Sequence, residues 1–159
     1  MKLDKRRRQE YKTNFHKRLI LLKARAPRLV IRKSNKYILL QIVESKNAQD
    51  KVVYSVSTKD LLEYGWPEEK QGSLKSIPAA YLGGYLIGKK AKGLKERVIL
   101  DTGLISSTKG SRVYAAVKGV SDSGLEIKYD EKIIPLKDRI EGKNTELNLI
   151  FNKVKGGIK

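Results

Sequence analysis

Few residues in this sequence could catalyse a reaction or bind a metal. There is no Cys, so thiol catalysis and thiolate metal sites are excluded. The single His, His16, lies in a basic segment where Glu10 is the only neighbouring acid, and the sequence offers no plausible Ser-His-Asp set. We therefore expect no catalytic residue, no metal ligand and no cofactor. We expect His16 to lie on the surface or to contact a phosphate.

One carboxylate, Asp101, is the remaining candidate for metal chemistry, because it ends a short apolar segment that predicts a buried strand. In nucleases of the ribonuclease H type, a carboxylate at a strand end joins other acids to hold two metal ions. The nearby acids Asp122, Glu126 and Asp130 show no inward spacing. We predict that Asp101 instead caps the turn that begins at Thr102, and we keep a metal-dependent nuclease as an alternative.

A glycine-bearing loop, Thr108-Lys109-Gly110-Ser111, precedes a predicted helix. Backbone N–H groups and the helix dipole at such a position can bind a phosphate. The loop is not a nucleotide-triphosphate motif, because its Lys precedes the Gly instead of following it. Lys109 and Arg112 flank the site, so we predict contact with a nucleic-acid phosphate, with a ligand-free helix cap as the alternative.

A second candidate is the turn Arg32-Lys33-Ser34-Asn35-Lys36-Tyr37. It places cations, a hydroxyl, an amide and an aromatic ring together. Such a turn can contact phosphates, 2′-hydroxyls and an unstacked base. Asn35 has donor and acceptor groups for this purpose, although it could also be present only to suit a tight hairpin.

Charge points to the same class of partner. The 159 residues include 35 Lys or Arg and 17 Asp or Glu, a net charge of +18. Residues 1–36 alone hold 14 basic residues and two acidic ones. This concentration predicts a basic arm that binds a polyanion. No apolar run is long enough to span a bilayer, so we expect no membrane partner.

The elements that must position these residues follow from hydrophobic periodicity. The predicted order is a helix over 6–24, strands over 28–33, 37–44 and 52–57 with a polar loop at 45–51, a short helix over 58–64, a helix over 77–92, a strand over 97–101 and a helix over 111–122. The first three strands predict an antiparallel meander. The fourth strand should run parallel to a neighbour, after a helical crossover, so the fold class is α/β.

The first predicted helix has one apolar stripe, Tyr11, Phe15, Leu19 and Leu22. We expect the stripe to dock on the protein's own domain, with the basic side outward. A basic helix lying on a membrane surface is the alternative.

The domain prediction has three parts: a basic RNA-binding arm over 1–26, an α/β domain over 27–130 and a charged C-terminal segment over 131–159. The small residues of the helix over 77–92 should let it approach the sheet closely. The last residues, 155–159, look frayed.

Several segments together resemble a known family. They are Tyr11-Lys12-Thr13-Asn14-Phe15-His16-Lys17-Arg18-Leu19, Pro27-Arg28-Leu29-Val30-Ile31-Arg32-Lys33-Ser34-Asn35-Lys36, Asp60-Leu61-Leu62-Glu63-Tyr64-Gly65-Trp66, Ile77-Pro78-Ala79-Ala80-Tyr81-Leu82-Gly83-Gly84, Leu100-Asp101-Thr102-Gly103-Leu104 and Gly110-Ser111-Arg112-Val113-Tyr114-Ala115. The set resembles the 5S-rRNA-binding protein family of the large ribosomal subunit, protein eighteen of the universal set in its archaeal form. That family is related to eukaryotic large-subunit protein five. The resemblance runs from residue 5 to about residue 130, and the C-terminal segment matches less clearly.

The resemblance implies a three-layer α/β/α fold with a mixed sheet, similar to ribonuclease H without its catalytic acids. It also implies a non-enzymatic protein of the cytoplasmic ribosome that binds 5S rRNA and helps attach it to the large subunit in the central protuberance. Large-subunit rRNA and neighbouring ribosomal proteins of that region would be further partners. The residues predicted to contact RNA are Arg6, Arg7, Arg8, Lys12, His16, Lys17, Arg18, Arg25, Arg28, Arg32, Lys33, Ser34, Asn35, Lys36, Tyr37, Lys109, Ser111 and Arg112.

Overall fold

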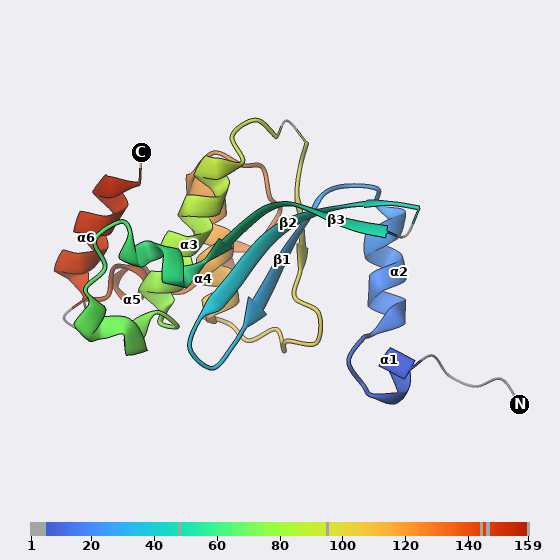
Figure 1. Ribbon diagram of the computed structural model, residues 1–159, viewed down its shortest axis with the longest axis horizontal. Helices are drawn as coiled ribbons and strands as arrows, with labels where there is room; N and C mark the ends of the chain where they lie inside the picture. The colour runs from blue at the N-terminus through green and yellow to red at the C-terminus, as the bar shows by residue number, and fades with distance from the viewer. Residues whose placement is uncertain (1–5, 48, 95, 144, 146, 159) are drawn as a thin grey trace, which may run out of the picture.

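A mixed four-stranded sheet forms the centre of the computed structural model, which describes residues 6–47, 49–94, 96–143, 145 and 147–158. The strand order is β3-β2-β1-β4 (Figure 1). Strands β1 (Arg28–Lys33), β2 (Ile38–Lys46) and β3 (Gln49–Ser57) form an antiparallel meander, and β4 (Ile99–Asp101) runs parallel to β1. The predicted meander and the predicted parallel strand are both confirmed.

Alternation along the strands divides the sheet into two faces. Leu29 and Ile31 of β1 and Leu40 of β2 are almost completely buried and form part of the core. Arg32 and Leu39 point to the opposite face and are exposed. Helices α3 (Ile77–Lys90) and α4 (Arg112–Asp122) cover the core face, and α2 (Phe15–Lys23) lies on the other side (Figure 1). The three-layer α/β/α fold is therefore confirmed.

Helices α3 and α4 pack backbone to backbone. A Cβ placed on Gly84 would lie 2.1 Å from the carbonyl oxygen of Ala116, and one on Gly119 would lie 2.1 Å from that of Tyr81. The small residues of α3 thus serve its contact with α4 as well as with the sheet. Ser76 caps α3 and Pro78 lies in its first turn, which explains where this helix begins.

The predicted helix over 6–24 is interrupted. A short helix α1 (Arg6–Gln9) ends before Tyr11, whose φ is 52°, and α2 begins only at Phe15. Asn14 supplies the reason, because its side chain accepts a hydrogen bond from the backbone N–H of Lys17 and starts a new helix.

The predicted polar loop at 45–51 is also wrong, because β2 and β3 continue into it and leave a tight hairpin. Asn47 turns this hairpin with a φ of 51°. Short 3-10 helices follow at η1 (Thr58–Leu62), η2 (Glu68–Ser73) and η3 (Glu131–Ile133).

The C-terminal region is more ordered than its charge suggests. It forms α5 (Lys137–Glu141) and α6 (Asn148–Gly157). The prediction of a frayed end is wrong for residues 155–158, and residue 159 lies outside the described residues. Phe151, Val154 and Ile158 are buried in the same core as the sheet. These residues are three and four positions apart, so they form an apolar helical stripe, and the neighbouring lysines make it inconspicuous in the sequence. Within the described ranges, no helix is long and apolar enough to cross a membrane.

Candidate nucleic-acid interface

A buried ion-pair network lies beneath the basic arm, and it corrects the prediction for Arg28. The Arg28 side chain is only 2% exposed. Its guanidinium donates to Asp101 Oδ2 at 2.8 Å, to Asp50 Oδ1 at 2.8 Å and to Ser45 Oγ at 2.9 Å. A guanidinium that is buried and already paired has no surface to offer a phosphate. Arg28 therefore holds β1 to β4 and to the β2–β3 hairpin.

Asp101 has the capping role predicted for it. Its Oδ1 accepts the backbone N–H of Gly103 at 2.9 Å and faces Arg32 Nη2 at 3.3 Å. Its other oxygen is paired with Arg28. No group of three potential metal-binding side chains occurs in the part of the chain that the structure describes. Both Asp101 oxygens thus serve the fold, and this leaves no geometric support for the nuclease alternative.

Asp50 connects the network to the arm. Its Oδ2 accepts a hydrogen bond from Arg18 Nη2 of α2 at 3.0 Å. Burial alone would raise the pKa of Asp50, but hydrogen bonds from Ser45, Arg18 and Arg28 outweigh it and hold the pKa below its ordinary value. We call this contact, in which Asp50 joins Arg18 to Arg28, the Asp50 clamp.

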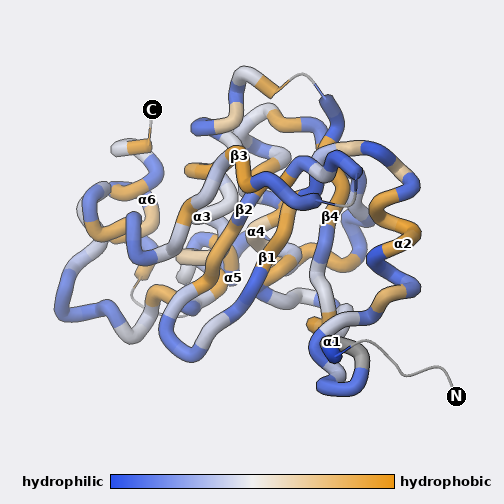
Figure 2. The backbone as a smooth tube through the Cα atoms, turned by 45° about the vertical axis from the view of Figure 1, so that its right-hand side comes forward, coloured by the Kyte–Doolittle hydropathy of each residue, from blue (hydrophilic) through white to orange (hydrophobic). Residues whose placement is uncertain are grey.

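The Asp50 clamp attaches α2 to the domain, and the predicted apolar stripe is only partly covered. None of the residues of α2 is buried, and the predicted stripe members Tyr11 and Leu19 are 87% and 53% exposed. Figure 2 shows α2 as an outer limb beside β4, with hydrophilic and hydrophobic stretches alternating along it. The other two stripe members, Phe15 and Leu22, are half-buried. The expected docking of the stripe on the domain is therefore not seen at Tyr11 and Leu19.

The arm presents its basic side chains to solvent. Arg6, Lys12, His16 and Lys17 are exposed. Glu10 approaches two of them, with its carboxylate 3.7 Å from Arg6 and 2.8 Å from Lys12. Arg25 is also exposed, whereas the side chains of Arg7 and Arg8 lie outside the described part of the structure.

The predicted turn at residues 34–37 is closed by Ser34. Its Oγ donates to the carbonyl of Tyr37 at 2.7 Å and accepts the Tyr37 N–H at 2.9 Å. Asn35 and Lys36 are exposed at the tip. Asn35 is not among the described residues with positive φ. The turn therefore needs no left-handed backbone at this position.

Arg32 makes hydrogen bonds within the domain but stays partly exposed. Its Nη1 donates to the carbonyls of Ile31 at 2.9 Å and Asp101 at 3.0 Å, while the side chain stays 44% exposed. This geometry fixes the guanidinium at the surface, beside the turn. It can contact a partner without first losing side-chain freedom.

The loop before α4 differs from the predicted phosphate cradle. The backbone N–H of Gly110 donates to the carbonyl of Ile133, and that of Ser111 donates to Thr108. These donors are therefore not available to a phosphate. Ser111 occupies the N-cap position but makes no side-chain hydrogen bond to the helix, and its buried Oγ has no hydrogen-bond partner among the residues that the structure describes.

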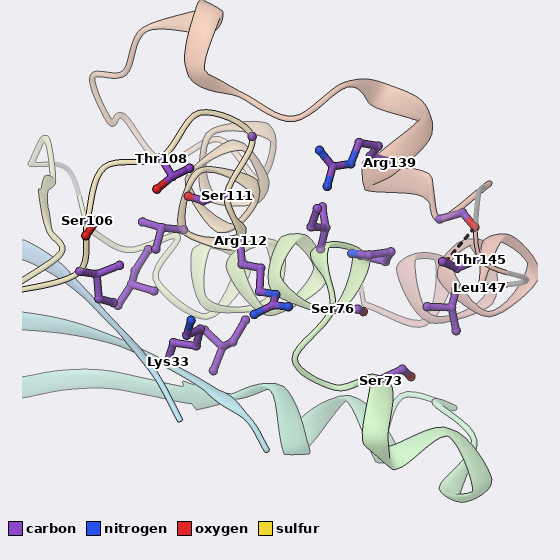
Figure 3. A pocket seen from close by; sticks show the side chains of 18 of the residues that line it. Lys33, Ser73, Ser76, Ser106, Thr108, Ser111, Arg112, Arg139, Thr145 and Leu147 are labelled. Carbon is purple, nitrogen blue, oxygen red and sulfur yellow. Dashed lines mark hydrogen bonds between the residues drawn. The ribbon is translucent and has the colours of Figure 1, made fainter. Parts of the chain in front are cut away.

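A cleft of about 1260 Å³ brings two of the predicted sites together. Lys33, at the start of the turn, and Ser111 and Arg112, at the start of α4, all line it (Figure 3). Arg139 of α5 also lines it and was missed, because the region after residue 130 looks like a charged tail in the sequence. Asn35, Lys36 and Lys109 are not among the lining residues.

Comparison with known proteins identifies related sequences. The family model described as "Ribosomal large subunit proteins 60S L5, and 50S L18" matches residues 1–96 and 92–130. The chain is 48% identical over 145 residues to the large ribosomal subunit protein uL18 of Korarchaeum cryptofilum, covering 90% of this chain and 72% of that protein. It is 45% identical over 139 residues to the uL18 of Methanothrix thermoacetophila, covering 86% and 79%. It is 42% identical over 140 residues to that of Methanoregula boonei, covering 87% and 78%.

Proposed function

Because the chain belongs to the family of large-subunit ribosomal proteins L5 and L18, we propose that it binds 5S rRNA and helps attach that RNA to the large subunit in the central protuberance. It is a structural constituent of the large ribosomal subunit and not an enzyme. Large-subunit rRNA and neighbouring ribosomal proteins are its further partners in this proposal.

The observation that carries the proposal is where the exposed positive charge lies. Residues 1–36 hold 14 of the 35 Lys and Arg residues. In the described part of this segment, most basic side chains are exposed on the arm and on the turn. Cations arranged along an exposed limb neutralise successive phosphates and release counterions, which gives strong binding to any nucleic acid.

Specificity then needs a rigid element, which the turn at residues 34–37 provides. It is held between two paired strands and closed by the Ser34 hydroxyl. Rigid groups lose less entropy on binding and can demand one RNA shape. We assign long-range attraction to the arm, and discrimination to Arg32, Lys33, Asn35 and Lys36.

The direct test compares 5S rRNA with a fully paired RNA of equal length, using the full chain over a range of salt concentrations. We expect 5S rRNA to bind at least about tenfold more tightly, equivalent to about 1.4 kcal/mol. Both RNAs should lose affinity as salt rises, because the arm contacts phosphates in each. Equal affinities at every salt concentration would contradict 5S recognition by this protein.

A further inference from the structure

The cleft at the carboxyl ends of β1 and β4 has no role in the function described so far. In open α/β sheets, ligands bind in the crevice outside these strand ends. We propose that the cleft binds an unpaired stretch of RNA, with phosphates at Arg112 and Arg139 and a base against its aliphatic floor. This inference rests on the proposed function, because it takes RNA as the partner.

Charge is the first reason. Lys33 comes from β1, Arg112 from α4 and Arg139 from α5, and all three line the cleft. None of the three forms an ion pair with another described residue, and no Asp or Glu is among the described lining residues. Converging like charges repel one another, and an anion placed between them relieves that repulsion.

Orientation is the second reason. Figure 3 shows the Arg112 side chain extending from the start of α4 into the space between Lys33 and Ser76, with Arg139 across the cleft. The buried hydroxyl of Ser111 has no hydrogen-bond partner among the described groups. A buried hydroxyl without a partner costs free energy, which a ligand oxygen could recover.

Size and lining favour an RNA strand as the occupant. The volume of about 1260 Å³ exceeds the roughly 300–1000 Å³ of pockets for drug-sized molecules, so a length of chain fits better than a small metabolite. Ile77, Pro78, Leu104 and Ile105 supply an aliphatic floor. The described lining contains no aromatic ring, so the guanidinium planes would stack on a base, as Arg does in other RNA complexes.

The connection between the cleft and the turn favours RNA over an acidic peptide, which is the other polymer with a suitable charge. Lys33 lines the cleft and also begins the turn that we assign to RNA. A strand that contacts the exposed tip of the turn can therefore enter the cleft without crossing an acidic surface. Every nucleotide also offers a phosphate and a 2′-hydroxyl to the lining hydroxyls, whereas a peptide offers charge only at its Asp and Glu residues.

The test uses a short single-stranded RNA that carries 4-thiouridine, bound to the full chain and to the double variant Arg112→Gln, Arg139→Gln. In the wild type, photocrosslinks should map to residues 104–113. The variant should lose these crosslinks, and the slope of log affinity against log salt should fall by about 1.4, since each single-strand phosphate contact is worth about 0.7.

The matched control is Lys90→Gln, Lys92→Gln. It removes the same charge from exposed residues at the other end of α3. This control should keep both the crosslinks and the slope, and thermal unfolding should show that both variants are folded. Crosslinks confined to the arm, or a slope equal to that of the control, would overturn the proposal. So would cleft amide shifts caused by an alternating Leu-Glu peptide but not by the RNA.

The two proposals can fail separately. If 5S rRNA binds no better than paired RNA but the oligonucleotide still crosslinks to the cleft, the 5S assignment fails and the cleft assignment stands. If 5S rRNA is preferred and the cleft variant behaves like its control, only the cleft assignment fails.

Discussion

Asn35 is the residue whose role can be tested most cleanly. The turn is closed by Ser34 and Tyr37, and Asn35 is exposed without positive φ, so its amide is not needed for the backbone. Asn35→Ala should lower the affinity for 5S rRNA by about 1 kcal/mol, the typical value of a hydrogen bond. Binding titrations with 5S rRNA and with paired RNA would measure this, and affinity for the paired RNA should change little.

The control for that experiment is Asn47→Gly in the other hairpin, where Asn has a φ of 51° and Gly is tolerated. If Asn35→Ala leaves both the 5S affinity and the melting temperature at wild-type values, the amide makes no contact. Discrimination would then have to come from Arg32, Lys33 and Lys36.

Asp50 should make stability depend on acid pH. Because the pKa of Asp50 is lower in the folded protein than its ordinary value of 3.8, the clamp contributes stability above pH 3.8. That contribution is lost as the pH falls through the folded-state pKa. We expect the free energy of unfolding to drop more steeply below pH 3.8 in the wild type than in Asp50→Asn, measured by urea denaturation at a series of pH values. Identical pH profiles would show that the clamp does not contribute.

At the scale of single residues, the sequence predicts local roles such as capping better than it predicts which distant side chains a residue contacts. The capping role of Asp101 and the exposure of Asn35 follow from local pattern. The basic run around Arg28 predicts an RNA contact, yet its partners Asp50 and Asp101 are 22 and 73 positions away. Asp101 is brought to Arg28 by the pairing of β4 with β1, and Asp50 by the pairing of β3 with β2, which itself pairs with β1.

Among the elements, the arm should be the least protected part of the free protein. Helix α2 has no fully buried residue, and its Arg18–Asp50 ion pair is one third exposed on each side. Backbone amides that lack tertiary burial exchange through local opening. Hydrogen exchange should therefore be fast over α2 in the free protein and slow in the 5S complex, with β1 and β2 amides protected in both. Equal protection of α2 in the two states would contradict ordering on binding.

The C-terminal helix α6 should be part of the folding unit. Phe151 is only 3% exposed and its ring lies 5.5 Å from that of Tyr81. Phe151→Ala should cost about 3–5 kcal/mol of unfolding free energy through lost burial and a cavity, measured by chemical denaturation. Leu149→Ala in the same helix is the control, because Leu149 is 83% exposed and its loss should change stability by less than about 0.5 kcal/mol.

Elements with strong local signals were predictable and those defined by their neighbours were not. Helix α3 has a capping Ser76 and a Pro in its first turn, and the structure places it where these signals indicate. Helix α6 buries only Phe151 and Val154 and depends on α3 for its partner surface, which the sequence does not show. The sequence predicts one helix across Tyr11, because the apolar stripe continues on both sides of the point where the Asn14 cap begins a new helix.

Over the whole molecule, the distribution of charge leads to the last prediction. The protein carries +18, and the first 36 residues hold most of the excess. Neutralising Arg6, Arg7 and Arg8 together, as Gln, should flatten the salt dependence of log affinity by about 2 units if all three contact phosphates. The change should be similar for 5S rRNA and for paired RNA, because phosphate contacts carry no sequence information.

Salt titrations of both RNAs measure this change in slope. The control variant has Lys90, Lys92 and Lys128 changed to Gln, which removes an equal exposed charge from the domain. A slope that falls equally in both variants would mean that net charge alone attracts RNA, and an unchanged slope would mean that these three arginines only face solvent.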